Sequence, residues 1–209
     1  MNNDRYIEVN NNIIHHIKRC ARNLEELRIT SFDDEGFWED ISDGKNDIIF
    51  PEVKKFQMEG ASSRNDLNLN FIFPKLETLT LKGEIPFAYR NFLANVRNLK
   101  ELTLDTHSTQ ENDLEHIFKN NENMKKICLS KPNRTETMQL IAKYLTKLET
   151  LELHLSHEKY LLRANKNTVY IFPLVTQFSI SFDLTVDVFK NEDLSFDMPE
   201  LKKLTIKGP

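Results

Sequence analysis

One short pattern of apolar and polar positions recurs along the whole chain. In residues 76–81 it reads apolar, two polar, apolar, one polar, apolar. Apart from Cys128, the intervening positions are polar or charged in every copy. A recurrence of 20 to 50 residues is typical of repeat architectures. Eight copies follow one another at intervals of 23 to 29 residues, beginning at Leu24, Val53, Leu76, Leu99, Met124, Leu148, Val175 and Leu201.

The pattern predicts one short strand in each copy. The last four positions alternate polar and apolar, which is the period of a strand with a single buried face. A strand of this length cannot bury its apolar face alone, but stacked copies can. We therefore expect residues 1–209 to form one α/β solenoid. Its curved parallel sheet would have about eight short strands, with helices and irregular segments on the convex side.

Apolar residues at helical spacing precede four of the strands. They predict helical return paths within residues 13–24, 92–99, 114–118 and 138–148, the first of them the main part of an N-terminal convex element over residues 1–22. A proline precedes each of the other four strands, in the pairs Phe50-Pro51, Phe73-Pro74, Phe172-Pro173 and Met198-Pro199. Because proline and its predecessor disfavour a helix, we expect looser or strand-like backs in these copies. Residues 185–189 fit either an extra strand or a short helix.

The polar positions of the strands predict a binding face. In this register they point away from the core, and the concave sheet is where solenoids usually bind their partners. Mixed charges and the absence of aromatic side chains favour a protein over single-stranded nucleic acid. The simpler interpretation is that these are ordinary solvent-facing strand positions without a binding role, rich in threonine because threonine favours strands. The expected contact residues are Thr78, Thr80, Lys82, Glu101, Thr103, Asp105, Lys126, Cys128, Thr150, Glu152 and His154.

An acidic insert separates the first two strands. Residues 31–49 carry seven acidic side chains against one lysine, and Trp38 is the only tryptophan in the chain. One interpretation is a solvated loop whose aromatic residues tuck against the solenoid. The other is a docking loop with Trp38 as its anchor, because tryptophan is enriched at interface hot spots.

Composition narrows the classes of function. The formal net charge of −4 disfavours a nucleic-acid partner, and no apolar run suggests a signal peptide or a membrane span. The two cysteines lie far apart and indicate free thiols in a reducing compartment, the cytoplasm or nucleus.

Catalytic and metal chemistry have weak support in the sequence. His15 and His16 are adjacent, and His154 lacks a ligand pair at helical spacing, so we expect no metal and no cofactor. A thiol enzyme would need Cys128 to have a lowered pKa and a base, for which His154 on the next strand is the one candidate.

The repeats resemble a known family. Residues 20–29, Cys-Ala-Arg-Asn-Leu-Glu-Glu-Leu-Arg-Ile, and residues 73–81, Phe-Pro-Lys-Leu-Glu-Thr-Leu-Thr-Leu, are similar to the leucine-rich repeats of F-box proteins. The resemblance covers about residues 13–207. The family's usual asparagine or cysteine beyond the strand is missing, and no F-box is recognisable.

The resemblance implies a non-catalytic interaction module that recognises the substrate of a ubiquitin ligase, with the adaptor-binding part missing or encoded elsewhere. A regulatory or ligand-sensing region of a larger immune-type or inhibitor-type protein is the alternative. We also expect the edge of the last strand, around residues 203–207, to be exposed and prone to association.

Overall fold

The computed structural model describes eight stretches of the chain: residues 22–30, 48–59, 71–83, 89–105, 111–130, 135–155, 168–182 and 194–208. The predicted helix at residues 13–20, the insert with Trp38 up to residue 47, and residues 185–189 lie outside them. The described helices include none that is long and apolar enough to cross a membrane.

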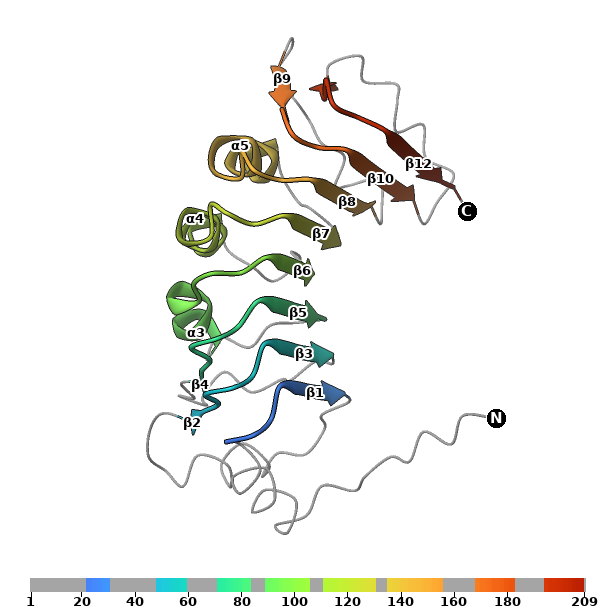
Figure 1. Cartoon of the computed structure of the whole chain (residues 1–209). Helices are drawn as coiled ribbons and strands as arrows, with labels where there is room; N and C mark the ends of the chain where they lie inside the picture. The colour runs from blue at the N-terminus through green and yellow to red at the C-terminus, as the bar shows by residue number, and fades with distance from the viewer. Residues whose placement is uncertain are drawn as a thin grey trace, which may run out of the picture.

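The centre of the molecule is a parallel sheet of eight strands, as the repeat pattern predicts, and the chain is of the α/β class (Figure 1). The strands lie side by side in chain order, so each copy of the pattern adds one strand beside the last. They are β1 (Glu26–Thr30), β3 (Lys55–Glu59), β5 (Thr78–Lys82), β6 (Glu101–Asp105), β7 (Lys126–Ser130), β8 (Thr150–Leu155), β10 (Gln177–Phe182) and β12 (Lys203–Lys207).

The strands share one register. Each polar position pairs with the same position of the next copy, as in Glu101 with Lys126 and Lys126 with Thr150. One backbone arrangement recurs at all seven junctions between copies. The carbonyl oxygen of the residue directly before each strand accepts hydrogen bonds from two consecutive N–H groups of the next copy. Between the first two copies, the Glu25 oxygen accepts from Lys54 and Lys55 at 2.8 and 3.2 Å. The same backbone contact therefore joins every pair of neighbouring copies.

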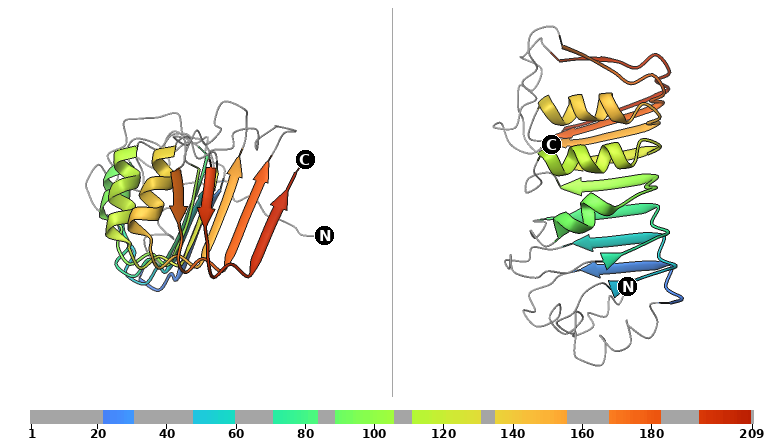
Figure 2. Two further views of the ribbon diagram at one scale, coloured as in Figure 1. Left: turned by 90° about the horizontal axis from the view of Figure 1, so that it is seen from above. Right: turned by 90° about the vertical axis from the view of Figure 1, so that its left-hand side faces the viewer.

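Three helices cover one face of the sheet. These are α3 (Tyr89–Asn95), α4 (Glu111–Asn120) and α5 (Thr135–Tyr144), which precede β6, β7 and β8. Figure 2 shows them packed on one side, and no helix or strand of the described stretches lies on the other side of the sheet. The helices predicted at residues 92–99, 114–118 and 138–148 are confirmed in place, although α3 and α5 end before the last apolar residue of the predicted stretch. Leu114, Ile117 and Phe118 of α4 are buried, as helical spacing requires.

Short strands replace helices in the four copies that have a Phe-Pro or Met-Pro pair directly before the main strand segment. Strand β2 (Ile48–Ile49) pairs in parallel with β4 (Phe71–Ile72), and β9 (Thr168–Ile171) pairs in parallel with β11 (Leu194–Asp197). Each ends directly before the Phe-Pro or Met-Pro pair. The predicted strand-like backs are confirmed, and the physical reason is the extended conformation that proline imposes on its predecessor.

Aromatic side chains fill the core of the copies that are backed by short strands instead of helices. The ring of Phe73 stacks on Phe50 and Phe56 at centroid separations of 5.2 and 4.9 Å, and it meets Phe92 edge-on at 5.4 Å. All four are buried. A strand occupies less depth than a helix, so larger side chains are needed to reach the packing density of a protein interior.

One buried polar residue joins two helix-backed copies. Asn121 is only 2% exposed. Its Oδ1 accepts a hydrogen bond from Leu99 N at 2.8 Å, and its Nδ2 donates to Val96 O at 3.1 Å and Ile117 O at 2.7 Å. In other copies the N–H of the first apolar residue of the pattern donates to the carbonyl three residues earlier and closes a turn, as in Met124 N to Asn121 O at 2.9 Å.

The turn before β6 differs because Asn98 has a positive φ of 65°. The Asn121 side chain supplies the partners that a closed turn would have provided for Leu99 and Val96. A buried N–H and a buried carbonyl are thereby satisfied.

The last strand of the sheet has an uncovered apolar side. Leu204 and Ile206 of β12 are 56% and 58% exposed. No described strand pairs with the outer edge of β12. The exposed edge expected around residues 203–207 is thus present among the described residues.

Candidate binding face

The open face is defined here as the side of the eight-stranded sheet opposite α3, α4 and α5. Its residues form three columns, because the shared register aligns equivalent positions across the strands. The middle column contains Arg28, Gln57, Thr80, Thr103, Cys128, Glu152, Ser179 and Thr205. The alternation of apolar and polar residues therefore placed the predicted contact residues in the correct columns.

Exposure differs across the predicted contact residues. Lys82, Glu101 and His154 are exposed, and Thr78, Thr80, Thr103, Lys126, Thr150 and Glu152 are half-buried. Asp105 is buried, with 9% of its surface accessible, although its position predicts an exposed carboxylate. Cys128 is 7% exposed. A partner on this face would meet the charged flanking residues first and the threonines of the middle column beneath them.

Two ion pairs on the open face join neighbouring strands. Lys126 Nζ lies 2.8 Å from Glu152 Oε1, and Lys82 forms an ion pair with Glu59. The hydrogen bond from Lys82 lowers the pKa of the Glu59 carboxyl. The hydrogen bond to Glu152 raises the pKa of Lys126. Positive and negative side chains therefore alternate on this face, and neither charge dominates it.

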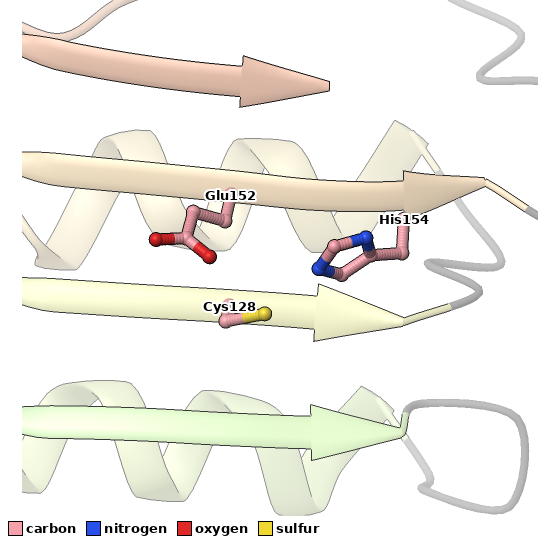
Figure 3. A group of neighbouring side chains, drawn as sticks. All are labelled: Cys128, Glu152 and His154. Carbon is pink, nitrogen blue, oxygen red and sulfur yellow. The ribbon is translucent and has the colours of Figure 1, made fainter. Parts of the chain in front are cut away.

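A compact group of three different side chains lies near the middle of the open face. The ligand atoms of Cys128 on β7 and of Glu152 and His154 on β8 all lie within 4.8 Å of one another. Figure 3 shows the three side chains on the near side of the strands, with helices behind. Cys128 and Glu152 are register partners, and His154 is two residues further along the same strand.

The surroundings of Cys128 suppress its reactivity. Burial raises the pKa of the thiol to about 11, and the negative charge of Glu152 adds to that rise. A nucleophilic cysteine needs the opposite shift. His154 does come close to Cys128, as their positions on adjacent strands suggest, but Glu152 shares the site and disfavours the thiolate.

Sequence reasoning missed the grouping of these three residues. We looked for metal ligands at spacings within one helix, whereas these ligands come from two strands and are 24 and 26 residues apart between β7 and β8. The alignment of the repeats could have predicted this grouping, because it places residue 128 beside residue 152 on the adjacent strand. Trp38, the expected anchor of a docking loop, lies outside the described residues.

No family model, curated protein or solved structure matches the chain.

Proposed function

We propose that the chain is a leucine-rich-repeat solenoid that acts as a non-catalytic module and binds a protein on its open face. The observation that supports this proposal is the asymmetry of the sheet. Helices and short strands cover one side of it, while none of the described elements lies over the other side of the eight aligned strands (Figure 2). Strands about 4.8 Å apart give seven steps of roughly 34 Å, enough for a folded partner or an extended peptide.

The charge pattern favours a protein partner over a nucleic acid. Phosphate recognition usually uses a basic face, whereas Lys82 and Lys126 are each neutralised by a carboxylate on a neighbouring strand. A mosaic of paired charges sets the register of a protein partner and excludes wrong ones. The half-buried threonines between the pairs add a neutral surface that hydrogen-bonds readily.

Substrate recognition for a ubiquitin ligase is the more specific form of this proposal. Its support is the resemblance of the repeats to those of F-box proteins. The second candidate is a regulatory or ligand-sensing region of a larger immune-type or inhibitor-type protein. The raised pKa of Cys128 disfavours the thiol-enzyme alternative.

The test compares arginine substitutions on the two sides of the sheet. Thr80→Arg with Thr103→Arg places two bulky cations on adjacent strands of the open face, since residues 80 and 103 are register partners. Asn112→Arg with Gln139→Arg adds the same charge at exposed positions of α4 and α5. Each protein is used to capture partners from a lysate, and candidate partners are then purified and titrated against it.

The expected result is loss of binding in the open-face variant alone, with unchanged circular dichroism in both variants. Equal binding by both variants would contradict the open-face proposal. Titration with a purified ligase adaptor tests the narrower proposal separately. Absence of adaptor binding would remove the ligase form and leave the binding module intact.

A further inference from the structure

We propose that Cys128, Glu152 and His154 form a binding site for a zinc ion on the open face of the sheet. Their sulfur, carboxylate oxygen and imidazole nitrogen already lie within 4.8 Å of one another (Figure 3). The site would exist whether or not a protein partner binds this face.

The two strands hold the ligands on one surface. Cys128 faces Glu152 directly across the β7–β8 pair, and His154 is paired with Ser130 two residues further along. Residues two apart on a strand point to the same side, so Glu152 and His154 must share the face of the sheet. The backbone thus positions all three side chains before any metal arrives.

The histidine ring is oriented for coordination. His154 Nδ1 lies 2.5 Å from the Ser181 hydroxyl oxygen on β10. When Nδ1 carries the proton, it donates to Ser181 and leaves the Nε2 lone pair free. Figure 3 shows the ring nitrogen farther from the backbone turned toward Cys128 and Glu152. A hydrogen bond at the second ring nitrogen is the usual support of a metal-binding histidine.

The chemistry of the donors selects the metal. Magnesium and calcium take oxygen ligands, whereas a set of one thiolate, one imidazole and one carboxylate suits zinc. Zinc bonds of about 2.0 to 2.3 Å require the donors to lie closer together than 4.8 Å, by roughly 1 Å. Glu152 is a half-buried side chain with rotatable bonds and can make that adjustment.

Three protein ligands leave one position of a tetrahedral zinc ion open. That position would face the open side of the sheet, because the strands and helices occupy the other side (Figure 3). Water or a donor from a bound partner could complete it. The proposed ion is therefore a point at which a partner with a histidine, cysteine or carboxylate side chain could be anchored.

Lys126 is the competitor for this site. Its ammonium group forms an ion pair with Glu152 Oε1 at 2.8 Å. A metal ion and an ammonium group repel each other, so Lys126 must give up part of this contact when zinc binds. Glu101 is its register partner on β6 and offers an alternative carboxylate. Removing the lysine charge should accordingly tighten metal binding.

The test uses the full chain with Cys20→Ser, so that Cys128 is the only thiol. Cobalt(II) is added first, because thiolate coordination produces a charge-transfer band in the near ultraviolet. Zinc is then titrated in to displace cobalt and to give the relative affinity. We expect one cobalt per chain, a charge-transfer band, and loss of that band in Cys128→Ser.

Further variants distinguish a metal site built from three ligands from metal binding by the Cys128 thiol alone. Ser181→Ala should weaken binding by about 10- to 100-fold, the usual effect of losing a supporting hydrogen bond. Glu152→Ala and His154→Ala should weaken it more, while Lys126→Gln should strengthen it. Asn123→Ala, at an exposed position away from the open-face columns, serves as the control and should leave affinity unchanged.

Two results would overturn the proposal. One is the absence of the charge-transfer band in the Cys20→Ser protein when circular dichroism shows it folded. The other is a band that persists unchanged in Glu152→Ala and His154→Ala, which would indicate cobalt held by the thiol alone.

Discussion

The side-chain oxygen of Asn121 accepts a hydrogen bond from the backbone N–H of Leu99, across the boundary between two repeats, at 2.8 Å. The same amide donates to two buried carbonyls. Asn121→Leu should lower the free energy of unfolding by about 1 to 3 kcal/mol, the usual cost of leaving a buried polar group without its partner. Urea denaturation measures the change.

Asn123 offers the matched control for Asn121. It is exposed and its Oδ1 accepts a hydrogen bond from Lys147 Nζ at 2.6 Å. Asn123→Leu should change stability by less than about 0.5 kcal/mol. Equal effects of the two substitutions would show that the buried amide does not join the repeats.

The aromatic core of the first strand-backed repeats gives a second prediction. Phe73 is 9% exposed and contacts four other phenylalanine rings. Phe73→Ala should destabilise the protein by about 3 to 5 kcal/mol, through lost burial and a residual cavity. Phe73→Leu should cost less, since it retains most of the volume. Thermal unfolding of both variants provides the measurement, and an alanine variant as stable as the leucine variant would contradict the packing argument.

The ion pair between Glu59 and Lys82 gives a third prediction, on pH dependence. The hydrogen bond from Lys82 lowers the folded-state pKa of Glu59 below its unfolded value. Its contribution to stability is therefore present above the unfolded pKa and is lost as pH falls through the folded pKa. Lys82→Met should return the Glu59 pKa toward its ordinary range.

Carboxyl NMR during an acid titration follows Glu59 directly. Lys207→Met removes the same charge at the exposed end of β12 and should leave the Glu59 titration unchanged. A Glu59 pKa that stays low without Lys82 would sink the assignment.

The thiol of Cys128 gives a fourth prediction. A pKa of about 11 leaves about one thiol in 10,000 ionised at pH 7. In the Cys20→Ser protein, alkylation should be slow at neutral pH and should accelerate about tenfold per unit of pH up to about pH 10. An alkylation rate that levels off near neutral pH would reveal a lowered pKa and revive the thiol-enzyme alternative.

The outer strand gives a fifth prediction. Leu204 and Ile206 are exposed beside an edge that no described strand covers, so the chain should associate at high concentration through β12. Leu204→Thr with Ile206→Thr should reduce that association in sedimentation experiments. Ile49→Thr with Val169→Thr alters equally exposed apolar residues elsewhere and should not. A monodisperse unmodified chain would refute the prediction.

Much of the fold follows from local patterns. The alternation around Leu79 and Leu81 predicts each strand and its buried side, and the proline after Phe73 predicts a looser or strand-like back in place of a helix. These are short-range effects, and each is repeated often enough to be recognised. The helix-backed and strand-backed repeats could therefore be told apart from the sequence alone.

The candidate site depended on contacts between repeats, which local patterns do not show. The role of Asn121 arises from its hydrogen bonds to the preceding copy, and the burial of Asp105 is a property of the folded chain that the alternating pattern does not predict. Cys128, Glu152 and His154 come together only when the register between β7 and β8 is fixed. That register could be inferred, but the reach and direction of the side chains required the structure.

The change from strand backs to helix backs also sets where the molecule bends. Packed helices are spaced about 8 to 10 Å apart, whereas paired strands are about 4.8 Å apart on both layers. Figure 1 shows α3, α4 and α5 more widely separated than β6, β7 and β8. Because the helices behind β6, β7 and β8 need more room than the strands, they favour a curve in these central repeats with the helices on its outer side.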